Sequence, residues 1–160
     1  MDSHRHAVDK QRVELGELLG EAAETARPAA RAKNIVLGVD TESPQHVVAD
    51  RPQLLRLVDN LLANAIKFTL AGGTVRLVAR GNAATATLEV TDTGVGITSA
   101  DRPDLFKRFF RGTIAIEKAI PGSGLALAIS KVIAEAHGTT IQVENTAGAE
   151  STFRVAFPAA

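Results

Sequence analysis

The stretch from Asp50 to Thr69 has the clearest hydrophobic pattern in the chain. Its apolar residues recur at intervals of three and four, which places them on one face of an α-helix. They are Leu54, Leu55, Val58, Leu61, Leu62, Ala65 and Ile66. Asp50 suits the N-cap position, Gln53 completes a capping-box pattern, and Pro52 is compatible with the first turn. The pattern therefore predicts a helix over the whole stretch.

A narrow polar stripe lies opposite this apolar face. It consists of Gln53, Arg56, Asn60, Asn64 and Lys67. Asparagine is a mediocre helix former, so a stripe built only for stability would favour Glu, Lys or Arg. Two interpretations stay open on this pattern alone: a solvated surface that tolerates both amides, or a face that binds a ligand.

Weaker patterns predict the other elements. Residues 1–12 are polar and aperiodic, and are expected to be a disordered N-terminal segment or residue of cloning. Residues from Val13 predict a helix that Pro28 should kink or interrupt. Short strands at 35–40 and 46–49 precede the helix described above. A strand pair at 74–80 and 85–92, a helix over 125–137 and strands at 139–143 and 151–157 follow it.

This order of elements predicts an α+β fold, a two-layer α/β sandwich with helices on one face of the sheet. Residues 97–123 lack regular periodicity, and a loop of that length in a compact domain is more often a functional lid than a simple connection. Alternation along the second strand of the pair places Asp92 on the same face as Leu88 and Val90. A carboxylate that continues a core-facing row is costly unless something binds it.

Composition narrows the functional classes. A chain of 160 residues with 45% hydrophobic residues is long enough for one domain with a proper core. Lys+Arg and Asp+Glu both number 18, so no net field favours nucleic acid or a membrane surface. Six Phe without Trp or Tyr leave few platforms for stacking bases. The absence of cysteine excludes disulfides and thiolate metal sites.

Two glycine-containing stretches carry candidate chemistry. Asp92-Thr93-Gly94-Val95-Gly96-Ile97 follows a strand, and its glycines permit close approach of a ligand. The Asp can accept a hydrogen bond from the exocyclic amine of adenine, although a tight turn or part of a calcium loop has the same pattern. Gly122-Ser123-Gly124 precedes a helix, where free backbone amides can bind an anion, although a plain hinge is equally compatible.

The asparagines gain a rationale if the anion is a triphosphate. Mg²⁺ prefers oxygen ligands and often keeps only one or two from the protein, so an Asn carbonyl oxygen is suitable. Lys67, one turn further along the stripe, could contact a phosphate oxygen. Arg108, Arg111 and Lys118 could close over the phosphates, and a solvated loop charge is an equally good interpretation of each.

These stretches, in this order, resemble the ATP-binding catalytic domain of bacterial sensor histidine kinases, in the gyrase–Hsp90–kinase–MutL ATPase superfamily. NLLANAIKFT resembles the N box of that family, DTGVGI its G1 box, LFKRFFRG its F box and GSGLALAIS its G2 box. The resemblance covers about Val13 to Pro158, and residues 13–160 are expected to form the catalytic domain. It implies a Bergerat-type sandwich with a mixed, mostly antiparallel sheet and a long ATP lid.

The resemblance also implies roles for individual residues. Asn64 would ligate Mg²⁺, Asn60 would lie on the phosphate side, and Asn60 and Lys67 would be the catalytic residues, with Lys67 touching phosphate or lid. Asp92 would hold the adenine amine, with Phe68 nearby and Ser151 at the position of a Thr that contacts this Asp in relatives. The remaining implied ATP-binding residues are Gly94, Gly96, Ile97, Arg111, Gly122, Gly124 and Leu125, and Phe106 and Phe109 would anchor the lid.

Two departures from the family pattern bear on function. Ala126 stands where the G2 box usually has Gly, which leaves nucleotide affinity open. None of the four histidines precedes the acidic residue of a phosphoacceptor motif, so they are interpreted as structural or incidental. The resemblance therefore implies a catalytic domain that transfers the γ-phosphate of Mg-ATP to a histidine on a separate dimerisation domain, with a response regulator downstream.

Three alternatives remain. The first is a superfamily ATPase, which is disfavoured because Asn60 occupies the position of the water-activating Glu, and an amide cannot act as a base. The second is an anti-sigma-type serine kinase, and the third is a binding module that has lost catalysis. The resemblance implies a cytoplasmic domain without nucleic-acid or direct membrane contact, and leaves open whether the parent protein is anchored in the bacterial inner membrane.

Overall fold

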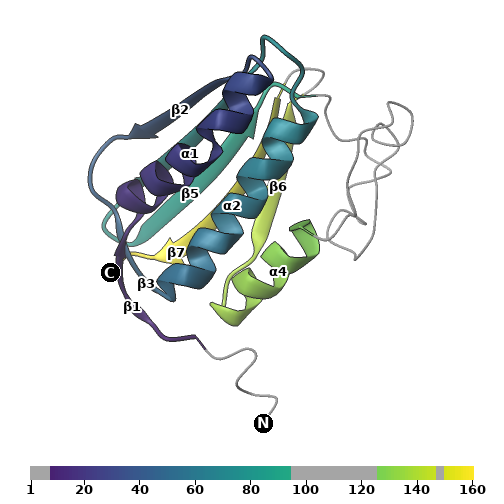
Figure 1. Ribbon diagram of the computed structural model, residues 1–160. Helices are drawn as coiled ribbons and strands as arrows, with labels where there is room; N and C mark the ends of the chain where they lie inside the picture. The colour runs from purple at the N-terminus through teal and green to yellow at the C-terminus, as the bar shows by residue number, and fades with distance from the viewer. Residues whose placement is uncertain (1–7, 95–125, 147–149) are drawn as a thin grey trace.

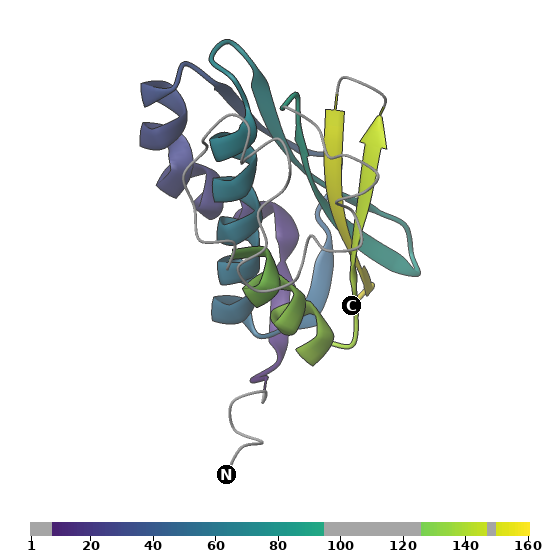
Figure 2. The ribbon, with the colours of Figure 1, turned by 90° about the vertical axis from the view of Figure 1, so that its right-hand side faces the viewer.

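The protein is built as a five-stranded sheet with a helical layer on one side (Figures 1 and 2). The computed structural model describes residues 8–94, 126–146 and 150–160. The sheet runs in the order β2-β4-β5-β7-β6, with β2 and β4 parallel and the other neighbours antiparallel. Its strands are β2 (Val36–Thr41), β4 (Thr74–Gly81), β5 (Thr85–Asp92), β6 (Ile141–Thr146) and β7 (Glu150–Pro158). The described helices are α1 (Leu15–Ala32), α2 (Arg51–Phe68) and α4 (Ala126–Ala136). The predicted sandwich and its mixed, mostly antiparallel sheet are confirmed.

A second, two-stranded sheet corrects the expectation for the N-terminus. β1 (Gln11–Glu14) pairs antiparallel with β3 (His46–Ala49), and Val13 is buried opposite Val47. The amide of Asp9 also donates to Oδ2 of Asp50, at 3.0 Å. The prediction that residues 1–12 are disordered is therefore wrong for Gln11 and Arg12, which lie in β1. The segment has no periodicity of its own, and its order comes from pairing with a strand far along the chain.

The first helix begins at Leu15, two residues later than its predicted start, and continues through Pro28. The expected interruption does not occur because Pro28 and Glu24, whose carbonyl loses its intrahelical donor, are both exposed to water. The helix ends in a Schellman motif. Asn34 adopts a positive φ of 59°, and the amide of Ile35 donates back to the carbonyl of Ala30 at 2.8 Å.

The predicted helix over 50–69 is confirmed as α2, with Asp50 as N-cap and Thr69 as C-cap. The backbone amide of Gln53 donates to Oδ1 of Asp50 at 3.1 Å, as a capping box requires. The reciprocal half differs from the prediction, because the side-chain amide of Gln53 donates to Oδ2 of Asp50. The Asp50 amide donates instead to Nε2 of His137, which follows α4, at 3.0 Å. His137 thus has a structural role.

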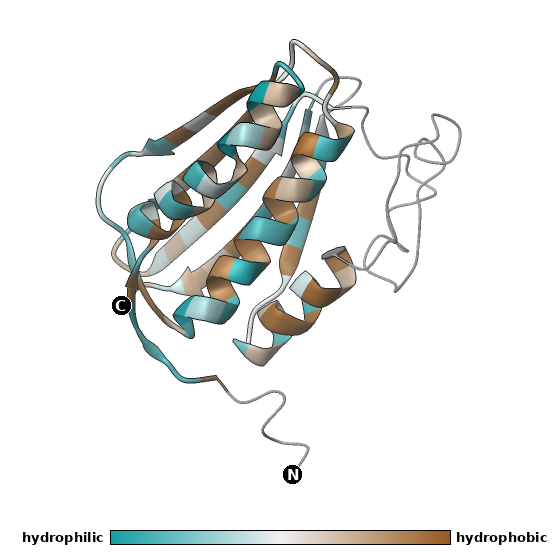
Figure 3. Cartoon of the chain, viewed as in Figure 1, coloured by the Kyte–Doolittle hydropathy of each residue, from teal (hydrophilic) through white to brown (hydrophobic). Residues whose placement is uncertain are grey.

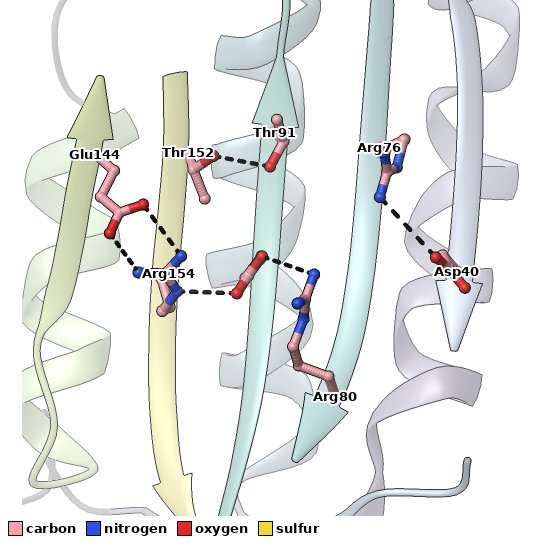
Figure 4. Close-up of polar contacts among 8 residues, drawn as sticks. Asp40, Arg76, Arg80, Thr91, Glu144, Thr152 and Arg154 are labelled. Carbon is pink, nitrogen blue, oxygen red and sulfur yellow. Dashed lines mark hydrogen bonds and ion pairs between the residues drawn. The ribbon is translucent and has the colours of Figure 1, made fainter. Parts of the chain in front are cut away.

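The face of the sheet away from the helices carries polar side chains (Figure 4). Glu89 on β5 is only 7% exposed, and it pairs with Arg154 on β7 at 2.9 Å and with Arg80 on β4 at 3.5 Å. Arg154 also pairs with Glu144 on β6 at 3.1 Å. Two basic groups neutralise the carboxylate that the sheet buries, and none of the described helices lies on this face.

The core lies between the sheet and the helices. α2 contributes Leu54, Leu57, Val58, Leu61, Leu62, Ala65 and Ile66, all buried. Figure 3 shows that α4 is predominantly hydrophobic, whereas the visible surface of α1 is mainly hydrophilic or neutral. Among the described residues, no helix is both long and apolar enough to cross a membrane.

Candidate functional site

Asp92 is the last residue of β5 and points into the core. The strand alternates so that Ala86, Leu88 and Val90 face the helices, and Asp92 continues their row with 5% of its surface exposed. Its cross-strand neighbours are Val75 on β4 and Ser151 on β7, both buried. The predicted core-facing carboxylate is therefore present, and the predicted pairing with Ser151 agrees with the sheet register.

Burial changes the acidity of this carboxyl group. The pKa of Asp92 is raised from 3.8 to about 6, chiefly because burial removes water from the charged form. The hydrogen bond from the Gly94 amide lowers the pKa, and the charge of Glu150 raises it. Near neutral pH the group is mainly ionised but poorly solvated. Such a carboxylate is suited to accept hydrogen bonds from a ligand that enters its site.

Gly94 brings the end of β5 against the end of α2. Its amide donates to Oδ1 of Asp92 at 2.8 Å. A Cβ atom at this position would lie 2.5 Å from that oxygen and 2.8 Å from the carbonyl oxygen of Phe68, closer than real Cβ contacts. Glycine is therefore required by the close approach of two backbones. The contact places the end of β5 beside Phe68, which lies one helical turn beyond Asn64 on α2.

The two asparagines of α2 are not on a freely solvated face. Asn60 and Asn64 are both half-buried, and α4 packs along α2 (Figures 1 and 2). In the part of the chain that the structure describes, Nδ2 of Asn60 is buried without a hydrogen-bond partner. A buried amide donor without a partner costs about 1–3 kcal/mol, so its presence calls for a partner from outside the described residues. This observation favours the ligand interpretation of the polar stripe.

Lys67 lies in a different environment from Asn60 and Asn64. Lys67 lines an open groove between α1 and α2, together with Asp59. Its own carbonyl accepts a hydrogen bond from the ammonium of Lys33. The backbone of Phe68, one residue further on, lies against Gly94 as described above. The described contacts thus bring Phe68, rather than the side chain of Lys67, to the Asp92 end of the fold.

Several predicted site residues lie outside the described residues. They are Gly96, Ile97, Arg111, Gly122, Gly124 and Leu125, and the lid residues Phe106, Arg108, Phe109 and Lys118 share this position. Two residues near the site were missed by the sequence reasoning. Lys33 bonds the end of α2, and the hydroxyl of Thr93 accepts a hydrogen bond from the amide of Thr74 at 2.9 Å. Asn34 is typical of a helix end and so signals where α1 stops, but no local pattern indicates either of these hydrogen bonds.

Residues 49–160 match the family described as histidine kinase-, DNA gyrase B- and HSP90-like ATPases. The chain is 37% identical over 147 residues to the sensor-like histidine kinase SenX3 of Mycobacterium tuberculosis, and the match covers 92% of this chain. The matched part is 36% of SenX3, so the chain spans about a third of the length of this relative.

Two solved structures share the fold at significant identity. The chain resembles the mycobacterial sensor histidine kinase MprB with a TM-score of 0.79 and 30% identity, over 94% of this chain and 97% of that one. It resembles full-length ShkA, solved in complex with AMPPNP, with a TM-score of 0.83 and 29% identity, over 96% of this chain and 32% of that one. The sandwich described above is therefore the architecture of histidine kinase catalytic domains.

Proposed function

The chain belongs to the family of histidine kinase-, DNA gyrase B- and HSP90-like ATPases, and we propose that it binds Mg-ATP and donates the γ-phosphate to a histidine on a separate dimerisation domain. The observation that carries the proposal is Asp92, a buried carboxylate whose position in the sheet places it beside the end of α2. The Gly94 amide already donates to this acid, and an adenine amine would supply a further donor to a carboxylate that burial leaves poorly solvated.

The residues present fit a magnesium nucleotide. Asn60 holds a buried amide donor without a partner in the described residues, which a phosphate oxygen can accept. Asn64 offers a neutral carbonyl oxygen, and would bind Mg²⁺ without adding charge near the phosphates. Phe68 and Ser151 would adjoin the adenine, because Gly94 touches the first and the sheet register places the second opposite Asp92.

The protein would act mainly by positioning and by offsetting charge. Phosphoryl transfer has a loose transition state whose charge is spread over the equatorial oxygens, and bound Mg²⁺ neutralises part of it. Asp92 would hold the adenine ring, and Asn60 and Asn64 of α2 would hold the phosphates at a set distance from it. Asn60 cannot act as a base toward water, which favours transfer to a histidine over hydrolysis. Gly96, Ile97, Arg111, Gly122, Gly124 and Leu125 remain predictions for the phosphate and lid side, and so does Lys67.

The proposal extends to the setting of the domain. We propose that the catalytic domain includes β1 and α1, ahead of the family match at residue 49, because β1 pairs with β3 and α1 packs on α2 and β2. Its partners would be the dimerisation domain of the parent kinase and, downstream, a response regulator. A cytoplasmic location is part of the same proposal.

Transfer in trans tests this function. The chain would be mixed with the histidine-containing dimerisation domain of the parent kinase and with γ-labelled Mg-ATP. We expect label on that domain that is lost in acid and stable in base, as phosphohistidine is. Asp92→Asn should abolish the label, and Asp40→Asn, which removes an exposed carboxylate of the same sheet, should keep it. Release of free phosphate without labelled histidine would instead indicate an ATPase.

A further inference from the structure

The end of α2 is held by a side chain from outside that helix. The ammonium of Lys33 donates to the carbonyl oxygens of Ile66 at 2.9 Å and Lys67 at 2.6 Å. Lys33 is the C-cap of α1, and the Schellman motif of that helix fixes its backbone. The residue therefore ends one helix with its backbone and reaches the end of a second helix with its side chain.

The last carbonyls of a helix lack intrahelical donors, and groups beyond α2 supply donors to several of those at its end. The carbonyl of Ala65 accepts the amide and the hydroxyl of Thr69, at 3.0 and 2.8 Å. Those of Ile66 and Lys67 accept Lys33, and that of Phe68 lies against Gly94. Two carbonyls of the last turn thus depend on one cation. A cation here also offsets the negative end of the helix dipole.

The residues that follow Lys33 are hydrogen-bonded to the turn between α2 and β4. The carbonyl of Asn34 accepts a hydrogen bond from the amide of Gly72 at 2.7 Å, and the amide of Val36 donates to the carbonyl of Gly73 at 3.0 Å. A Cβ at Gly73 would lie 2.9 Å from the hydroxyl oxygen of Thr93. Lys33 therefore contacts the end of α2, and Asn34 and Val36 contact the turn that packs against the end of β5.

We propose that Lys33 is a positioning residue of the nucleotide site, one that sets the place of the last turn of α2 relative to Asp92. The inference rests on the proposed function. Without the ammonium, two part-buried carbonyls lose their donor, and the last turn of α2 is free to shift away from Gly94. The distance from the Asp92 carboxylate to the side chains of Asn60 and Asn64 would then vary, although Lys33 itself touches no nucleotide atom.

The test compares three variants by calorimetric titration with Mg-ADP, well below the unfolding temperature. Lys33→Met keeps an unbranched side chain, one atom shorter, and removes its donors. We expect affinity to fall between about threefold and thirtyfold, the range for residues that act through another group. Lys33→Arg restores two donors and should stay within about threefold of the wild-type affinity. Lys10→Met, at an exposed position before β1, is the matched control and should change nothing.

A second readout needs no nucleotide. In ¹H–¹⁵N spectra of the free protein, the Gly94 amide resonance should move in Lys33→Met and stay in place in Lys10→Met. Lys33→Met with affinity within twofold of wild type, or with an unmoved Gly94 resonance, would overturn the inference and leave the proposed function standing. Loss of affinity in Lys33→Arg equal to that in Lys33→Met would also overturn it. Wild-type protein that fails to bind Mg-ADP would overturn the proposed function and the inference together.

Discussion

Replacement of Asp92 by Asn should make the free protein more stable, by an amount that grows as pH rises from about 3.8 to 6. The carboxyl has a pKa of about 6 in the folded protein and of 3.8 in a solvated reference state. Between these values the folded chain holds a proton that the unfolded chain has lost. Stability therefore falls as pH rises from about 3.8 to 6, and is level above that window. Asn remains able to accept the Gly94 hydrogen bond and does not titrate.

The size of this effect follows from the two pKa values. A difference of about 2.2 corresponds to about 3 kcal/mol of lost stability at pH 8, at 1.36 kcal/mol per pKa unit. At pH 5 the loss is only about 1.6 kcal/mol, because the folded protein still holds most of the proton. The advantage of Asp92→Asn should therefore grow by about 1.4 kcal/mol between pH 5 and pH 8.

Urea unfolding of both proteins at pH 5 and pH 8, without nucleotide, measures this increase in the stability advantage of Asp92→Asn. At pH 8 the variant should also unfold about 6–12 °C above wild type, for a chain of this size. Asp40→Asn is the control, since it removes an exposed carboxylate of the same sheet, and it should keep the wild-type change between the two pH values. An advantage of Asp92→Asn that is equal at pH 5 and pH 8 would refute the reasoning, because it would show that burial does not hold the proton.

Three further predictions concern the metal, the base site and the sheet. Asn64→Ala should weaken ATP binding in the presence of Mg²⁺ and leave metal-free binding nearly unchanged, and titration with and without EDTA measures this; equal loss in both would reassign Asn64. ATP binding at pH 6 should release about half a proton, because the ionised form of Asp92 binds, and calorimetry in buffers of different ionisation enthalpy measures it; no release would contradict that role. Arg154→Met should lower the free energy of unfolding by about 1–3 kcal/mol, because its partner Glu89 is buried. Arg76→Met should lower it by less than about 1 kcal/mol, because its partner Asp40 is exposed. Equal losses in urea unfolding would show that burial of Glu89 is unimportant.

The elements that the sequence predicted well are those whose signal is local. α2 has a helical period, a cap at each end and a broad apolar face, and strand alternation alone placed Asp92 toward the core. The tight approach at Gly94 agrees with the expectation that glycines there admit a close neighbour. In these cases the residues that form the signal are also the residues that make the contact.

The features that the sequence did not reveal depend on contacts between distant segments. β1 is ordered by β3, the amide of Asp50 is bound by His137, and the end of α2 is bound by Lys33. No periodicity in Gln11–Glu14 indicates a strand, and nothing local marks the partner of either side chain. Pro28 was misjudged because its effect depends on whether the carbonyl it leaves without a donor faces water.

Titration with ATP and GTP at pH 7.5 tests the central claim, that Asp92 and the amides of α2 bind the two ends of one magnesium purine triphosphate. The account predicts that the wild-type protein binds Mg-ATP at least about tenfold more tightly than Mg-GTP, because guanine leaves the buried carboxylate without its donor. Asp92→Asn should lose this preference together with most of the ATP affinity. Equal binding of the two nucleotides by wild type, or undiminished ATP binding by Asp92→Asn, would contradict the account.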